Sequence, residues 1–197
     1  MQLINFAFFR LALLISLAAP YVQGASAGII VYSDVQMKTE DQRLRELLDD
    51  YFEDQLVLDP EGATFLGRDS YLNAFWSDYS EEGFMKSRNL NDKYTDLLGT
   101  IDLFALSKEA RIDYDLFEYS LEQSRAWLDT DLYLLPVSQM GGAPTDVESV
   151  LMAMPRETVA HYNNILSRLI AIPELLAQIT GLMARGLEKG ITYPKGA

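Results

Sequence analysis

Residues 39–58 read TEDQRLRELLDDYFEDQLVL and carry the clearest fold signal in this sequence. Gln42 follows Thr39 at the spacing of a capping box, in which each side chain satisfies a backbone N–H at a helix start. Apolar residues then recur at three- and four-residue spacing, as on an amphipathic helix: Leu44, Leu47, Leu48, Tyr51, Phe52 and Leu56. The stretch therefore predicts a helix that ends at Asp59-Pro60.

Similar signals recur along the rest of the chain. Ser80 and Ser107 are N-cap residues, Thr145 and Glu148 form a second capping box, and Pro155 and Pro173 each suit the first turn of a helix. The predicted later helices cover 61–66, 80–101, 107–127, 145–154, 155–172 and 173–190. Residues 68–79 are irregular and aromatic-rich, and Leu132–Pro136 is predicted to be extended. With almost no strand signal, the sequence predicts an all-α, bundle-like array of about six helices.

The last two predicted helices have a nearly continuous apolar surface. From the first of them we expect these side chains to point inward: Val159, Tyr162, Ile165, Leu166, Leu169 and Ile170. Two interpretations of the surface stay open. It is either buried core or a face that another domain should cover.

The amino terminus resembles a secretory signal. Arg10 is the only charged residue before Asp34, an apolar run follows it at 11–19, and Ala25-Ser26-Ala27 supplies small residues for cleavage. We predict a signal peptide at 1–27 cleaved after Ala27, a flexible start at 28–38, and export to a bacterial periplasm. The alternative is an uncleaved anchor at 3–22, in which Arg10 would be costly in hydrocarbon.

The amino-acid composition of the chain limits the classes of partner that it can bind. The chain has 197 residues, a formal charge of −13, no cysteine and one histidine, His161. So acidic a protein lacks the basic surface that nucleic acids need, and it is repelled by anionic lipids. We therefore expect no nucleic-acid partner and no stable membrane association after signal cleavage. Without disulfides, the fold must depend on packing.

Conventional catalytic motifs are missing. Four carboxylates lie close together in a predicted helix, where they would form a cation site, an acid–base pair or a solvated face with weak ion pairs: Asp113, Asp115, Glu118 and Glu122. His161 lacks the second histidine of a His-Glu-x-x-His helix. We therefore predict no catalytic residue and no metal-ligand set.

Two irregular segments suggest a binding surface. The glycines of Ser138-Gln139-Met140-Gly141-Gly142 would bring backbone N–H groups near an anion, or simply make a turn. Tyr71, Trp76 and Tyr79 would line a sugar or peptide groove, or anchor their segment on the core.

Several segments in a fixed order resemble the amino-terminal part of the bacterial DUF885 family. They are LDPEGATFLG at 58–67, RIDYDL at 111–116, LLPVSQMGG at 134–142, Met154-Pro155, Arg168-Leu169 and RGLEKGITYP at 185–194. The resemblance covers residues 40–195. It implies that 39–197 is the incomplete first region of a larger helical, zincin-like fold.

The resemblance also implies a zinc-dependent peptidase or carboxypeptidase, whose zinc helix lies in the later part of such proteins. No residue here matches that helix. Zinc and a peptide substrate are therefore expected only for a full-length family member. Six residues that match the family's pattern are candidates for lining a cleft: Arg111, Asp113, Asp115, Gln139, Gly141 and Gly142.

Three functional hypotheses follow. The first is an amino-terminal fragment of an exported zinc-peptidase-like protein, truncated after Ala197 and inactive alone. The second is a self-contained periplasmic helical module that binds a peptide or protein. The third is a small hydrolase that uses the carboxylates of residues 113–122. The ordered motifs favour the first.

Overall fold

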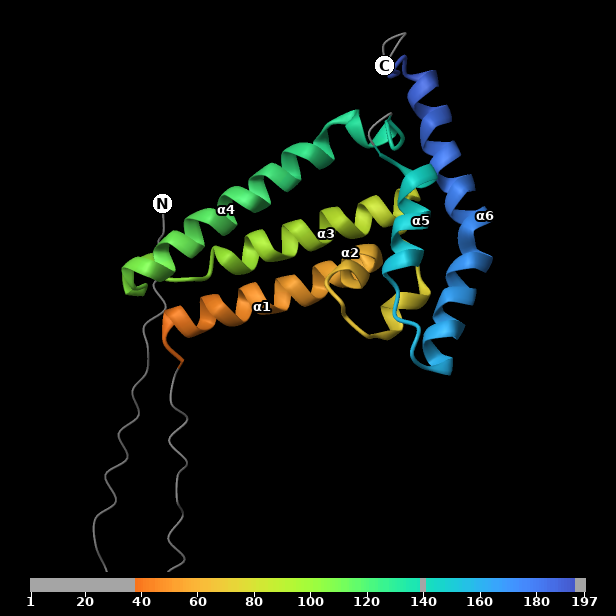
Figure 1. The fold of residues 1–197 in the computed structure, drawn as a ribbon. Helices are drawn as coiled ribbons and strands as arrows, with labels where there is room; N and C mark the ends of the chain where they lie inside the picture. The colour runs from red at the N-terminus through yellow and green to blue at the C-terminus, as the bar shows by residue number, and fades with distance from the viewer. Residues whose placement is uncertain (1–37, 139–140, 194–197) are drawn as a thin grey trace, which may run out of the picture. The chain divides into compact units, whose positions relative to one another are not determined.

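The computed structural model of the protein describes residues 38–138 and 141–193, so the predicted signal peptide and Gln139 lie outside the described residues. The described part is helical and contains no β-strand (Figure 1). Its α-helices are α1 (Glu40–Leu58), α2 (Pro60–Phe65), α3 (Glu81–Leu98), α4 (Lys108–Asp129), α5 (Ala143–Ala153) and α6 (Val159–Glu188). Three 3₁₀ turns join them: η1 (Tyr71–Ala74), η2 (Leu103–Ala105) and η3 (Asp131–Leu134). The predicted all-α class is confirmed.

The predicted helix starts of the first half are present. Thr39 Oγ1 accepts a hydrogen bond from Gln42 N at 3.2 Å, and Gln42 Oε1 accepts one from Thr39 N at 3.0 Å. Ser80 and Ser107 accept the N–H groups of Gly83 and Ala110 in the same way. These side chains satisfy N–H groups that have no partner within their own helix.

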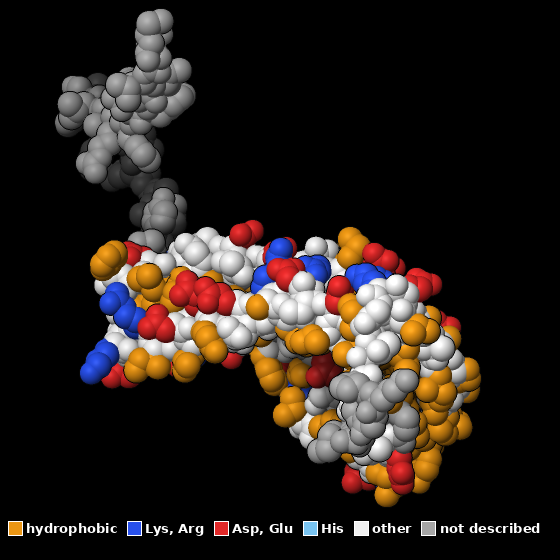
Figure 2. Space-filling model, turned by 90° about the horizontal axis from the view of Figure 1, so that it is seen from above, with side chains coloured by type: hydrophobic (Ala, Val, Ile, Leu, Met, Phe, Trp, Pro, Cys, Tyr) orange, Lys and Arg blue, Asp and Glu red, His pale blue; other side chains and the backbone are white. Residues whose placement is uncertain are grey.

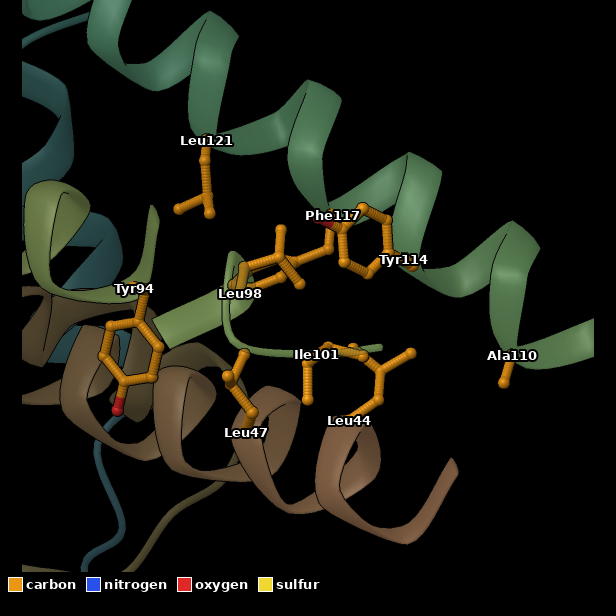
Figure 3. Packing of buried hydrophobic residues seen from close by; sticks show 9 residues of the cluster. All are labelled: Leu44, Leu47, Tyr94, Leu98, Ile101, Ala110, Tyr114, Phe117 and Leu121. Carbon is orange, nitrogen blue, oxygen red and sulfur yellow. The ribbon is translucent and has the colours of Figure 1, made fainter. Parts of the chain in front are cut away.

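A first core lies where α1, α3 and α4 pack side by side. Figure 3 shows side chains of α4 pointing toward those of α1 and α3. The buried members are Leu44, Leu47, Tyr94, Leu98, Ile101, Ala110, Tyr114, Phe117 and Leu121. The Tyr51 ring meets Tyr94 and Phe117 edge-on, with centroids 5.0 Å and 4.9 Å away. These three helices therefore bury one common apolar surface.

The carboxy-terminal part of the described chain differs from prediction because α6 is one helix of 30 residues. No helix begins at Pro155. Instead, Thr158 Oγ1 caps the N–H of His161 at 3.2 Å. Pro173 does not begin a helix either. It lies inside α6 on an exposed side, where water can bond the carbonyl group that loses its N–H partner. Buried side chains before and after Pro173 pack against η1 and η3, and this packing keeps the helix continuous.

The inward face predicted for residues 159–170, the first part of α6, was also wrong. Of the side chains expected inside, Ile165 alone is partly buried, and the other five are exposed. The buried residues are His161, Arg168, Leu175, Ile179, Leu182 and Gly186. Two of these are polar side chains that find hydrogen-bond partners inside, so hydrophobic periodicity selected the wrong side of the helix.

Three boundaries differ as well. Residues 131–134 form the 3₁₀ turn η3 rather than an extended segment, because Thr130 Oγ1 caps the N–H of Leu132. Helix α5 begins at Ala143, before the predicted Thr145 cap, because the Gly142 carbonyl already accepts the N–H groups of Thr145 and Asp146. Helix α3 ends at Leu98, earlier than the predicted Ile101.

Gly186 allows α6 to approach η3, and this contact can be tested. A Cβ atom there would lie 3.0 Å from the carbonyl oxygen of Ile191 and 3.1 Å from that of Leu134. We expect Gly186→Ala to lower the free energy of unfolding by about 1–3 kcal/mol. Gly181→Ala, in the same helix with nothing within 4 Å, should instead raise it by about 0.5–1 kcal/mol. Urea unfolding followed by circular dichroism measures both, and equal effects would contradict the close approach.

Two carboxylates tie the start of α1 to the segment between α3 and α4. Glu40 accepts the N–H of Asp102, and Asp41 accepts that of Ser107, both at 2.9 Å. These backbone hydrogen bonds are the main reason that the pKa of each carboxyl lies below its ordinary value of 4.5 or 3.8. A lowered folded pKa gives stability that is present above the unfolded pKa and is lost as the pH falls through the folded value.

We therefore expect the free energy of unfolding to fall as the pH drops below 4.5, partly through these two groups. Glu40→Gln combined with Asp41→Asn should make this acid loss smaller. The control is Asp49→Asn with Asp50→Asn, two exposed residues of α1 that accept no such bond among the described contacts. Denaturant unfolding over a pH series would show the difference. If the free energy of unfolding fell equally with pH in both double variants, the stabilising role of the Glu40 and Asp41 hydrogen bonds would be refuted.

Candidate functional site

A cavity of about 200 Å³ lies between α2, the segment after η1, α5 and α6. Aromatic, acidic and apolar side chains line it, together with the serines Ser77 and Ser149. The aromatic ones are Phe65, Trp76 and Tyr79, the acidic ones are Asp59, Glu61 and Asp146, and the apolar ones include Val147, Val150, Leu175 and Ile179. Ala143, Leu175 and Ile179 form a second core against which Trp76 and Tyr79 pack. The cavity is therefore an opening in a packed region.

Ser77 holds the Glu61 carboxylate in place. The N–H of Ser77 lies 3.1 Å from both carboxylate oxygens, and its hydroxyl group donates to Oε2 at 2.6 Å. Asp59 accepts the N–H of Gly62 at 2.9 Å as the N-cap of α2, and Asp146 accepts the hydroxyl of Thr145 at 3.2 Å. Within residues 38–138 and 141–193, none of the three carboxylates forms an ion pair. The cavity wall thus carries negative charge without a basic partner at ion-pair distance.

The phenol group of Tyr79 has a raised pKa in this cavity. Burial is the main cause that raises the pKa of its phenol to about 12, and the nearby carboxylates of Glu61, Asp146 and Asp59 contribute to the same rise. The hydroxyl therefore stays protonated at neutral pH and can donate a hydrogen bond. The backbone N–H of Tyr79 donates to Gln178 Oε1 at 2.9 Å, which anchors this segment to α6.

Arg168 holds the same segment from the inside. Its Nε donates to the carbonyl of Phe75 at 2.8 Å and its Nη2 to that of Pro60 at 3.0 Å. Its guanidinium lies 5.2 Å from the Trp76 ring centre, and Trp76 Nε1 donates back to the Arg168 carbonyl at 2.9 Å. The side chain is fully buried, and burial lowers its pKa. This one residue connects α2, the aromatic segment and α6.

The cleft-lining residues predicted from the sequence separate into two groups. Gly142 lines the cavity with a positive φ of 128°, and a Cβ there would lie 3.0 Å from the carbonyl oxygen of Pro136. Its neighbour Gly141 accepts the N–H of Ser138 at 2.9 Å. By contrast, Arg111, Asp113 and Asp115 are exposed on α4 and line none of the described cavities. Gln139 lies outside the described residues.

The three aromatic residues predicted to form a groove or an anchor also differ in position. Trp76 and Tyr79 line the cavity and also pack on the second core, as the anchoring interpretation expected, whereas a sugar or peptide groove stays a prediction. Tyr71 is exposed and meets Phe75 edge-on at 6.4 Å. Sequence reasoning missed Asp59, Glu61 and Asp146. Their one signal was that Asp59 and Glu61 lie within the LDPEGATFLG segment.

The acidic stretch of α4 is divided between solvent and another cavity. Glu118 and Glu122 line a space of about 620 Å³ between α3 and α4. Arg125 in that space pairs with Asp92 and Asp129. Asp113 and Asp115 are exposed elsewhere on the helix. The four carboxylates therefore do not share one site.

The described residues do not form a set of ligands for a zinc ion. No three His, Cys, Asp or Glu side chains among them are grouped as metal ligands. The single histidine is already engaged, because His161 Nδ1 accepts the N–H groups of Glu157 and Thr158 at 3.0 Å and 3.2 Å. Its Nε2 therefore carries the hydrogen and donates to Asp69 Oδ2 at 3.0 Å.

The profile of a family described as "Bacterial protein of unknown function (DUF885)" matches residues 60–197. The chain belongs to the DUF885 family. The match includes α2 to α6, so this DUF885 region holds every cavity-lining residue except Asp59. Searches of curated proteins and of solved structures found no match.

Arg168 gives a direct test of how the DUF885 cavity is held together. We expect Arg168→Met to lower the free energy of unfolding by about 2–4 kcal/mol, because the Phe75 carbonyl loses its bond to Arg168 and the buried Pro60 carbonyl keeps only its other donor, the Thr64 hydroxyl. In a Trp127→Phe background, the emission of Trp76 should shift to the red as its segment loosens. Arg45→Met, at an exposed position of α1, is the control. Loss of less than about 0.5 kcal/mol with unchanged emission would contradict the anchoring role.

Proposed function

We propose that this DUF885 chain binds a cationic group of a peptide, an amine or a guanidinium, in the cavity of Glu61, Trp76 and Tyr79. The observation that carries the proposal is the composition of the wall. Three carboxylates without ion-pair partners among the described residues surround one small space that aromatic rings also line. A cation gains from both kinds of contact.

Preorganisation favours binding at this position. Ser77 fixes the Glu61 carboxylate before any ligand arrives, so little side-chain entropy is lost on binding. A cation over the face of Tyr79 would gain about 0.5–2 kcal/mol. The Trp76 ring already carries the Arg168 guanidinium on one face, so it contributes apolar lining instead. Tyr79 stays protonated and adds a hydrogen-bond donor for a ligand carbonyl group.

The size of the cavity suggests what enters it. Its volume of about 200 Å³ is smaller than the roughly 300–1,000 Å³ of sites that enclose a whole small molecule. One side chain or one terminal amine fits this space better than a complete ligand does. A peptide meets this requirement, since it presents a single basic group while the rest of the chain stays outside.

The biological setting is part of the proposal. The resemblance to zinc-dependent peptidases supports a peptide ligand, and the signal-like sequence at 1–27 supports export to the periplasm. The described residues lack a zinc-ligand set. We therefore propose that this chain binds and positions a peptide. Zinc-dependent cleavage, which the resemblance implies, would rest on residues other than those of this cavity. A self-contained binding module would use the same cavity.

The test compares two peptides that differ by one charge. In the Trp127→Phe background, acetyl-Ala-Arg-Ala-amide should change Trp76 emission on titration, whereas acetyl-Ala-Gln-Ala-amide should not. Added salt should weaken the response. Glu61→Gln should weaken binding at least about tenfold, which corresponds to the loss of about 1.4 kcal/mol.

Glu118→Gln is the matched control, because Glu118 is an exposed carboxylate that does not line this cavity. Its affinity for the arginine peptide should equal that of the parent protein. Circular dichroism checks that the Glu61→Gln protein is folded. Equal binding of the arginine and glutamine peptides, or no binding by the parent protein, would refute the proposal.

A further inference from the structure

The outward face of α6 carries a regular apolar stripe, which we call the outer seam. Its members follow alternating three- and four-residue steps along the helix, with Pro173 and Thr180 completing the series. They are Val159, Tyr162, Leu166, Leu169, Leu176, Met183 and Leu187. All seven are exposed, by 43% to 78% of their surface. The spacing is that of a helix that packs along another helix.

No charged side chain interrupts the outer seam. Arg168 points to the inside of the molecule, and Glu174, Arg185 and Glu188 occupy other positions around the helix. Ile170 widens the seam and is itself 78% exposed. Figure 2 shows hydrophobic surface gathered at the right-hand side, the side on which α6 lies in Figure 1. In a chain with a formal charge of −13, an uncharged face of this length is unusual.

The area of the face matches what a stable interface needs. A fully exposed large side chain presents roughly 150–250 Å², so the seam with Ile170 offers on the order of 800 Å². A standard protein interface buries about 800 Å² on each partner, whereas the largest apolar patch of a typical monomer is about 300–600 Å². The 30 residues of α6 give a contact line of about 45 Å.

We infer that the outer seam is the contact surface for a second copy of this chain. A second copy brings a helix of the same length with the same alternating spacing, as a two-fold interface requires. The inward side of α6 lines the peptide cavity through Leu175 and Ile179. Pairing along the seam therefore leaves the cavity open, and the inference does not depend on the proposed ligand.

A bilayer and a further domain, the interpretation that the sequence left open, are the competing occupants, and a further domain would leave this chain with a single-chain mass. Among the described residues, α6 is the one helix long and apolar enough to cross a membrane, a test that core helices of soluble proteins also pass. Yet the guanidinium of Arg168, in this helix, bonds to the carbonyls of Pro60 and Phe75. Insertion of α6 would have to break these contacts and expose a charge to lipid. A second copy covers the seam without disturbing them.

The first experiment measures the mass of the full chain in solution by light scattering and sedimentation over a wide range of concentration. We expect the mass of two chains. Ile170→Glu and Leu166→Glu should each weaken the dimer at least about tenfold. Leu116→Glu is the matched control, because it places the same charge at an apolar side chain of α4 that is 62% exposed. That variant should remain a dimer.

The second experiment uses the absence of cysteine from the chain. Single cysteines at Tyr162, Leu169, Leu176 and Met183 are oxidised, with Ser120→Cys on α4 as control. A parallel pair would cross-link at every seam position, and an antiparallel pair only near the middle of the helix. Either pattern supports the inference, provided that the Ser120→Cys protein does not cross-link.

Three results would overturn it. The first is a single-chain mass at all concentrations. The second is a dimer unaffected by Ile170→Glu and Leu166→Glu, because another surface, such as the apolar run at 11–19, would then be responsible. The third is a single-chain mass together with co-sedimentation with vesicles of phosphatidylethanolamine and phosphatidylglycerol, which would assign the seam to a bilayer.

Discussion

The guanidinium of Arg168 is the constraint on which the cavity half of the structure depends. It is fully buried and bonds to the carbonyls of Pro60 and Phe75 beside the face of Trp76, while the nearby Glu61 carboxylate favours its charged form. A buried charge is costly unless such partners are in place, so these segments must meet at one position on α6. One of its nitrogens, Nη1, has no hydrogen-bond partner within the described residues, so the arrangement retains part of that cost. What the buried residue provides is geometric, because the planar guanidinium group with its fixed donor directions holds two chain segments at once.

The cavity follows from this arrangement. Once Arg168 fixes Phe75 and Trp76, Ser77 reaches Glu61 and Tyr79 reaches Gln178. Glycine at position 142 then lets the turn before α5 close the remaining side, where a Cβ atom would meet Val137 and Pro136. Negative charge collects in this space because each acidic side chain is there for a local reason. Asp59 caps α2, Glu61 binds Ser77, and Asp146 lies in the first turn of α5.

The sequence predicted the first half of the fold better than the second. Its capping boxes and apolar stripes are local signals, and Thr39, Ser80 and Ser107 all cap helices as predicted. In the first part of α6 the same rules failed, because the continuity of the helix through Pro173 and the burial of Arg168 depend on contacts far along the chain. Hydrophobic periodicity is a local pattern, so it cannot predict that Arg168 binds the carbonyl of Pro60, 108 residues earlier. The cavity was missed for the same reason, except for Gly142 and the aromatic segment.

The sequence separation of these contacts also orders the assembly of the protein. The bundle of α1, α3 and α4 draws on a contiguous stretch that ends at Asp129, so its core can close as soon as that stretch has been synthesised. The aromatic segment at 75–79 must wait much longer, until Arg168 emerges to bind it. A nascent chain therefore carries a finished bundle beside an unfinished binding region. The same division makes the contacts of α6 the natural place for the native protein to open first, with the bundle still intact.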